Sequence, residues 1–369
     1  IHRMCIWLIN YNSGDIVNHS IIYLFGFDNS YDEIIIAANG DTKLEWPVIN
    51  GFFKIFVELH EGVNIIQLST TKSHLSFTLI YQSIITENFI QLVYLTSVNE
   101  NDSLFEHIPR FVYMTKIIQC VLNEILYKQT GYRRTFQIET TNKIQCHCVK
   151  LINKKDFYMK MNGEDLYRQI YLESNNVISN RNKSRVIALL SFLTDINDEF
   201  KMNETSGTCA FAYDTFTVIS IPYFINWPKS LNDFWNILNV KSNHFFYSVG
   251  VYLHELCHLY SVQHGDNDNI MSQGFSAAQN FFLVTEQMLT IMLNGQCSCY
   301  HMSLTRLSAK LLYENGKTHR IHENYYECIY NYCRFPIVFL KNRSKPSQCY
   351  CNGRFQFQID HCDLLLKQL

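Results

Sequence analysis

The sequence predicts an α+β protein in which a β-rich unit precedes a larger region of mixed helices and strands. The chain has 369 residues, more than a single hydrophobic core usually supports, so two or more domains are expected. Short runs of β-branched and aromatic residues fill the segment 1–97, which is typical of strands. From about residue 110, apolar residues instead recur at helical spacing.

The composition is that of an ordinary globular chain and excludes several classes of function. Hydrophobic residues make up 47% of the chain, which is enough for a large core and rules out general disorder. The formal net charge is -2, so there is no broad electrostatic basis for binding nucleic acid. No stretch of about 18 apolar residues lacks charge, so we expect no membrane span. Nothing in the composition indicates the oligomeric state.

Cysteine usage predicts a cytoplasmic protein with mostly reduced thiols. The chain has 13 cysteines, an odd number that is scattered along it, whereas secreted disulfide frameworks are usually short and have even counts. Because the chain starts with Ile1 rather than Met, secretion stays open as an alternative. Cys-x-Cys pairs such as Cys146–Cys148 and Cys297–Cys299 leave open a second, structural zinc or disulfides, although zinc knuckles usually have two residues between the cysteines.

Residues 1–97 are predicted to form a β-sandwich. Strand-like runs such as 21–26 and 77–81 are separated by Asn, Asp and Gly. In the segment 51–64 apolar residues alternate up to the turn Glu61-Gly62, and such alternation buries one face of a sheet. This segment resembles the strand-turn-strand core of immunoglobulin-like modules, which implies a sandwich of about seven strands.

A polar stretch at 99–103 marks the predicted domain boundary. We assign residues 98–300 to a second domain and leave 301–369 as a Cys-containing extension without a predicted function. The second domain is expected to begin with a helix, followed by a strand near 133–139. The sequence from about residue 150 to residue 207 is polar, and its residues favour helix.

The most informative motif is His254-Glu255-x-x-His258. On a helix the two histidines are one turn apart and project from the same face. Neutral imidazoles at that separation can both bind one Zn²⁺. Glu255 lies beside such a metal, where its carboxylate can take a proton from the bound water as a general base.

A catalytic zinc needs a third protein ligand and one open position for water. His264 stands six residues after His258, so the chain must turn sharply after about Tyr260 to bring it back. Asp266 or Asp268 is the alternative third ligand. The sequence therefore predicts one zinc per chain.

These residues resemble the motif of the metzincin metallopeptidases, H-E-x-x-H-x-x-G-x-x-H followed by a Met-containing turn. This resemblance implies that His254, His258 and His264 are the metal ligands and that Glu255 is the base. It also implies that Met271 forms the apolar floor beneath the metal. The glycine of the motif is here Ser261. The bend favours a left-handed backbone, which costs a residue other than glycine about 1–2 kcal/mol.

The resemblance extends to a narrower group, the zinc metallopeptidases of fungi with a sandwich before the catalytic region. It rests on the segments 130–136, 226–231 and 268–275. It implies a zincin-like catalytic domain in which a twisted sheet and two helices surround the metal, with the first helix at 110–128 and the zinc helix at 246–260. The strand at 216–221 would line the substrate cleft as an edge strand, or alternatively be a central strand of the core.

The sequence thus predicts a zinc-dependent peptidase that acts on protein or peptide substrates. The alternative is a catalytically silent, metal-stabilised binding or scaffold protein. Glu255 favours the enzyme, because a purely structural zinc site has no use for a base. Cys257, inside the motif, is expected to pack the helix rather than to act as a redox-sensitive thiol.

Overall fold

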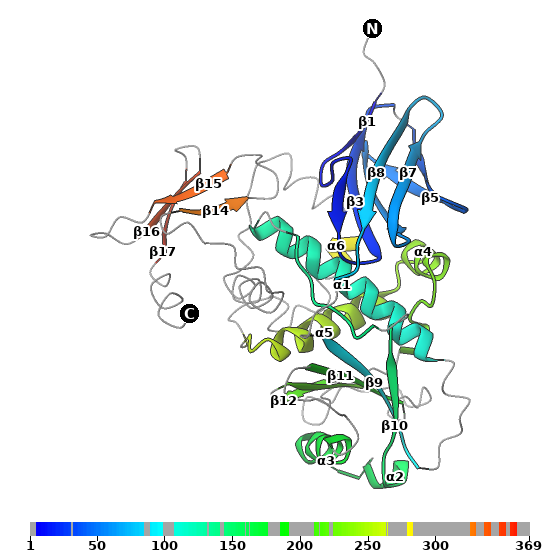
Figure 1. Ribbon diagram of the computed structural model, residues 1–369, viewed down its shortest axis with the longest axis vertical. Coiled ribbons are helices and arrows are strands. Elements are labelled where there is room, and N and C mark those ends of the chain that lie inside the picture. The colour runs from blue at the N-terminus through cyan, green and yellow to red at the C-terminus, as the bar shows by residue number, and fades with distance from the viewer. Residues whose placement is uncertain are drawn as a thin grey trace. The chain divides into compact units, whose positions relative to one another are not determined.

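The computed structural model is a mixed α+β protein with large β-sheets, which confirms the predicted fold class at that level (Figure 1). The structure describes residues 5–30, 32–84, 89–98, 107–130, 133–140, 144–158, 160–161, 163–175, 185–191, 210–213, 215–220, 224–262, 264 and 279–282, together with strands at 325–329, 336–340, 347–351 and 355–359.

The chain divides into two compact units. The larger unit comprises residues 1–122 and 135–284, and the smaller one residues 123–134 and 285–369. The larger unit contains both the predicted sandwich and the His254–His264 segment. The predicted boundaries near residues 98 and 300 stay predictions.

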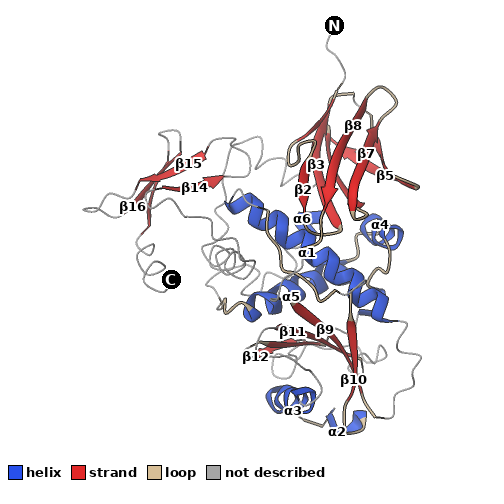
Figure 2. Cartoon of the chain, viewed as in Figure 1, coloured by secondary structure: helices blue, strands red, loops and turns tan. Residues whose placement is uncertain are grey.

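The first sheet of the larger unit has eight strands. In spatial order they are β1 (Ile6–Leu8), β3 (Ile21–Asp28), β6 (Phe52–Glu58), β5 (Thr42–Ile49), β4 (Ile34–Asn39), β7 (Gly62–Ser69), β8 (His74–Tyr81) and β2 (Asp15–Val17). All neighbours are antiparallel except β2 and β8. Strand β4 contacts β6 although β5 lies between them, and β1 contacts β8 from the far side of the sheet. The sheet is therefore folded back on itself (Figure 2).

Strand β7 buries alternate residues, whereas β6, for which the alternation was predicted, does not. On β7, Asn64 and Ile66 are buried while Val63 and Ile65 are exposed, as one buried face requires. On β6 every residue from Phe53 to Val57 is buried, so the prediction of a single buried face is wrong there. The other face of β6 is covered by helices from later in the chain.

Those helices join the first sheet to the rest of the larger unit. The Phe56 ring lies 4.9 Å from Phe234 on α4 (Leu231–Asn239) and 5.7 Å from Phe282 on α6 (Gln279–Phe282), measured between ring centroids. Beside it, the buried Lys54 ammonium donates to Phe281 O at 3.0 Å. The first sheet and these helices therefore share one core.

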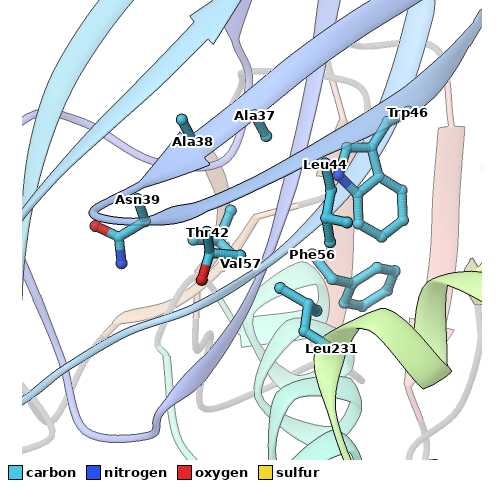
Figure 3. Close-up of a pocket in the computed structure, with 9 residues that line it drawn as sticks. All are labelled: Ala37, Ala38, Asn39, Thr42, Leu44, Trp46, Phe56, Val57 and Leu231. Atoms are coloured by element: carbon cyan, nitrogen blue, oxygen red, sulfur yellow. The ribbon is translucent and has the colours of Figure 1, made fainter.

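A small cavity lies in this core, between the β4–β5 hairpin, β6 and α4 (Figure 3). Its volume is about 10 Å³, room for about one water molecule. The lining residues are mostly apolar: Ala37, Ala38, Asn39, Thr42, Leu44, Trp46, Phe56, Val57 and Leu231. None of them belongs to the His254–His264 segment, so this cavity is not the predicted catalytic site.

The second sheet has five strands. Their order is β10 (Cys146–Lys150), β9 (Ile90–Thr96), β11 (Arg185–Leu190), β13 (Phe216–Ile219) and β12 (Ala210–Tyr213). The first four are parallel and β12 is antiparallel to β13. The helices α1 (Ile108–Thr130) and α5 (Asn243–Leu259) cover one face, whereas α2 (Lys155–Tyr158) and α3 (Gly163–Asn175) lie on the other (Figure 1).

Two expectations for this region are corrected. For the segment 216–221 the sequence left a cleft edge or a central strand open; the edge is wrong and the central position is confirmed, because β13 pairs on both sides and β12 lies at the edge. A central position suits β13 because all four of its residues are buried and apolar or hydrogen-bonded. The segment 133–139 forms no strand beyond an isolated bridge between Ile90 and Ile138.

The smaller unit contains an antiparallel sheet of four strands. They follow one another in sequence order as β14 (Tyr325–Ile329), β15 (Pro336–Leu340), β16 (Ser347–Cys351) and β17 (Phe355–Ile359). The extension 301–369, which had no predicted fold, is thus β-rich in its described part. Across the whole described chain, no helix combines the length and the apolar character that crossing a bilayer requires.

Candidate metal centre

The helix α5 carries the first two histidines and is almost entirely buried. Ser242 caps its start by accepting a hydrogen bond from Phe245 N at 3.4 Å. Buried residues, most of them apolar, lie on all sides of the helix, as expected for a helix enclosed by protein. Tyr252 fixes it against α1 through a 2.8 Å hydrogen bond with the Thr115 hydroxyl. A helix is thus present where the sequence predicts one at 246–260, and it begins a few residues earlier.

The chain reverses at the end of α5 through a Schellman motif. Val262 N donates to Cys257 O at 3.1 Å and Ser261 N donates to His258 O at 2.8 Å, the two bonds that define this helix end. In this motif the residue after the C-cap, here Ser261, must adopt a left-handed backbone. Its φ angle is 58°. The glycine position of the metzincin pattern is thus left-handed here, although a serine occupies it.

This reversal brings His264 back to the two histidines of the helix. The Nε2 atom of His258 lies 3.0 Å from that of His254 and 3.1 Å from that of His264, and the third separation is 3.2 Å. A tetrahedral ion bound at about 2.0–2.1 Å holds its ligand nitrogens about 3.3 Å apart. The three imidazoles therefore fit one metal ion, and among the described residues they form the one cluster of this kind.

The hydrogen bonding of His258 also suits a metal ligand. Its Nδ1 lies 2.8 Å from Val262 O, and a carbonyl oxygen can only accept, so Nδ1 carries the proton. In the neutral ring Nε2 then presents its lone pair toward the other two histidines. Burial lowers the pKa of His258, and the neighbouring His264 contributes to the same shift. The ring is thus kept neutral, as metal binding requires.

Glu255 follows His254 on α5 and is a buried carboxylate. Its side chain is 7% exposed, and Oε2 has no hydrogen-bond partner among the described residues. Burial raises the pKa of Glu255 to about 8, because the charged form loses its hydration. Its backbone carbonyl accepts a hydrogen bond from Thr217 Oγ1 of β13 at 3.5 Å, which ties the residue to the sheet. An unpaired, buried carboxylate oxygen of this kind needs a cation, a water molecule or a proton.

Of the other residues that the sequence analysis named near this site, the structure describes Cys257 but not the three that follow His264. Met271, Asp266 and Asp268 lie outside the described residues, so the Met-containing turn and the alternative third ligand stay predictions. Cys257 is buried, and burial raises the pKa of its thiol to about 12. This agrees with a packing role, since reactivity needs the thiolate.

The cysteine pair on β10 carries neither a disulfide nor a metal cluster within the described chain. Cys146 and Cys148 are free thiols, and neither belongs to a group of three metal-ligating side chains. The pairs beyond residue 283 lie among residues whose side chains the structure does not describe.

One further residue contacts this site without any signal in the sequence. Arg185, the first residue of β11, donates from Nε to Leu259 O at 2.8 Å, and its guanidinium lies 4.3 Å from the centroid of the Tyr260 ring. The two partners are 74 residues apart in the chain. No local pattern around Arg185 could have predicted this contact.

Comparison with family models gives one match. Residues 5–156 match a model described as "Putative peptidase family". The match covers less than half of the chain and ends before His254, so it does not test the histidine cluster. It supports peptidase activity, and with the histidine cluster it supports a metal-dependent enzyme. No curated protein sequence matches the chain.

Comparison with solved structures finds distant similarity to OgpA from Akkermansia muciniphila. The catalytically inactive protein in complex with an O-glycopeptide (glycodrosocin) substrate has 14% identity and a TM-score of 0.39, with 53% of this chain and 56% of that chain covered. Two crystal forms of the wild type have 16% and 12% identity, with TM-scores of 0.37 for both. They cover 49% and 60% of this chain and 50% and 64% of those chains. This chain thus spans less than two thirds of each OgpA chain.

Proposed function

We propose that this protein is a zinc-dependent peptidase of the zincin type, with Zn²⁺ held by His254, His258 and His264. The observation that carries the proposal is the convergence of the three Nε2 atoms within 3.2 Å of one another. The residue that follows His254, Glu255, has a buried carboxylate oxygen without a partner among the described residues. Three neutral imidazoles with an adjacent base are the donor set of a catalytic zinc. The peptidase family match at residues 5–156 agrees with this reaction class.

The ion would supply Lewis-acid polarisation of the scissile carbonyl and lower the pKa of a coordinated water from 15.7 to about 7. The protein itself would contribute the group that accepts and returns the proton, the carboxylate of Glu255. A bound cation would favour the ionised form of Glu255 and so oppose the effect of burial on its pKa. The buried, unpaired Oε2 would then accept the proton of the attacking water and return it to the leaving amine.

The finer assignment to the metzincins rests on two further residues. Ser261 has the left-handed backbone that the motif's glycine provides, which supports this spacing of the third ligand. Met271 is proposed as the floor of the metal site by resemblance alone. A protein or peptide is the proposed substrate. Strand β12 lies next to α5 at the end of the second sheet, and its outer side pairs with no strand in the described part of the chain, so an extended peptide could add there.

The base is tested by the substitution Glu255→Gln, which is nearly isosteric but accepts no proton. We expect it to lower kcat for hydrolysis of unfolded casein by about a hundredfold or more, the usual contribution of a general base. Zinc content should stay close to that of the wild type, because Glu255 is not a ligand. Hydrolysis at the wild-type rate in this variant would contradict the proposed role of Glu255.

The same assay separates the enzyme from the silent scaffold. The wild type should cleave casein and lose this activity in 1,10-phenanthroline, with recovery on addition of zinc. His258→Ala should abolish both zinc binding and cleavage. If the wild type binds zinc and folds stably but cleaves neither casein nor a peptide library, the catalytically silent metal-stabilised protein is the correct alternative.

A further inference from the structure

The end of α5 depends on a residue from another part of the chain. The last carbonyls of a helix have no partner within it and must find one elsewhere. The Schellman motif satisfies Cys257 O and His258 O. The next carbonyl, Leu259 O, accepts the Nε–H of Arg185 at 2.8 Å. Arg185 therefore completes the hydrogen bonding of the turn that precedes His264.

Arg185 is suited to hold this turn in one position. It begins β11, a strand paired on both sides, by β9 and β13, and its own backbone N–H donates to Phe89 O at 3.2 Å. Its guanidinium carbon Cζ lies over the Tyr260 ring, 4.3 Å from the centroid, a cation–π contact that arginine favours. A positive charge at a helix C-terminus is also favoured by the helix dipole. The turn is thus fastened to the rigid centre of the second sheet.

The turn needs such support because its backbone is unfavourable for its own sequence. Ser261 has φ of 58°, a conformation that residues other than glycine rarely adopt. If the turn relaxed, Val262 O would leave Nδ1 of His258, and Nε2 of His264 would leave the other two imidazoles. Two of the three proposed ligands therefore depend on the geometry of one strained residue.

We propose that Arg185 is a positioning residue of the metal centre, which sets the affinity for the ion by holding the turn between His258 and His264. It contacts none of the three imidazole rings in the hydrogen bonds described, and it acts through Leu259 O and the Tyr260 ring. This inference rests on the proposed zinc centre and adds a determinant of its affinity.

The test is the zinc dissociation constant of Arg185→Ala in the full chain, measured by competition with a chromophoric chelator. Loss of a partner that orients metal ligands typically weakens metal binding by 10–100-fold, and we expect a loss in that range. The Co²⁺-substituted variant should also lose visible absorption intensity and approach the spectrum of His264→Ala, because the third imidazole no longer stays in place.

Arg110→Ala is the matched control. Arg110 on α1 also donates from its guanidinium to a backbone carbonyl, that of Trp227, but it does not touch the turn at 259–262. This variant should lose thermal stability while its zinc dissociation constant and its cobalt spectrum stay those of the wild type. If the role of Arg185 were purely structural, Arg185→Ala would behave like Arg110→Ala: it would lose thermal stability but keep the zinc dissociation constant and the cobalt spectrum of the wild type.

Rescue variants keep the inference testable if Arg185→Ala folds poorly. Arg185→Lys keeps the positive charge but lacks the planar guanidinium group. It should weaken zinc binding more than Arg110→Ala does. Adding Ser261→Gly to either Arg185 variant should recover part of the affinity, because glycine adopts this backbone without strain. Wild-type zinc affinity and cobalt spectrum in both Arg185 variants would overturn the role of Arg185, whereas absence of zinc binding by the wild type would overturn the zinc centre itself.

Discussion

The substitution Ser261→Gly should stabilise the protein, because it removes strain at the turn that carries His264. Ser261 has φ of 58°, a left-handed backbone that costs an L-residue about 1–2 kcal/mol. Glycine loses more backbone entropy on folding, which offsets about 0.5–1 kcal/mol of this gain. We therefore expect a net gain of about 0.5–1 kcal/mol in the free energy of unfolding.

The assay is thermal unfolding of the zinc-free chain, followed by circular dichroism. For a domain of this size, the gain corresponds to a rise of about 1–4 °C in Tm. Ser261→Ala is the control, since it removes the same hydroxyl but keeps the strained backbone, and its Tm should not rise. If Ser261→Gly lowered Tm, or if Ser261→Ala raised it equally, strain at Ser261 would not be the reason.

Two further predictions concern the first sheet. Phe56→Ala should destabilise the larger unit by about 3–5 kcal/mol, because the Phe56 ring is fully buried against Phe234, and urea unfolding should show the loss. Burial alone would raise the pKa of Asp32, but hydrogen bonds from Thr71 and nearby hydroxyls, together with the Lys72 ammonium, lower it to about 2 from 3.8. A lowered carboxyl pKa stabilises the folded chain above pH 3.8, and this contribution disappears as the pH falls through about 2. Asp32→Asn should therefore flatten the pH dependence of Tm in that window, and an unchanged slope would exclude Asp32 as its source.

The histidine cluster could be predicted from the sequence because local rules determine most of it. A helix places His254 and His258 on one face by its period alone. The position of His264 depends on a turn whose signal, a glycine, is absent, and the bonds of the Schellman motif supply the turn instead. The support by Arg185 could not be predicted, since a contact over 74 residues leaves no local pattern.

The errors in the fold also have physical reasons. Strand β11 lies in a polar part of the sequence for which helix was predicted. Arg185–Leu190 is nevertheless a continuous apolar run after its first residue, the pattern of a buried parallel strand. The alternation on β6 indicated one buried face because no local rule reveals that α4 and α6 cover the other. Strand β13 was assigned to an edge because pairing order is a property of the whole sheet.

The most direct test of the central claim is X-ray absorption at the zinc edge of the purified chain, combined with metal analysis. We expect one zinc per chain, with three imidazole nitrogens at about 2.0–2.1 Å and one further light atom. His264→Ala should reduce the imidazole count by one. Sulfur neighbours at about 2.3 Å, or a wild-type chain that retains no zinc, would contradict the assignment of the ion to His254, His258 and His264.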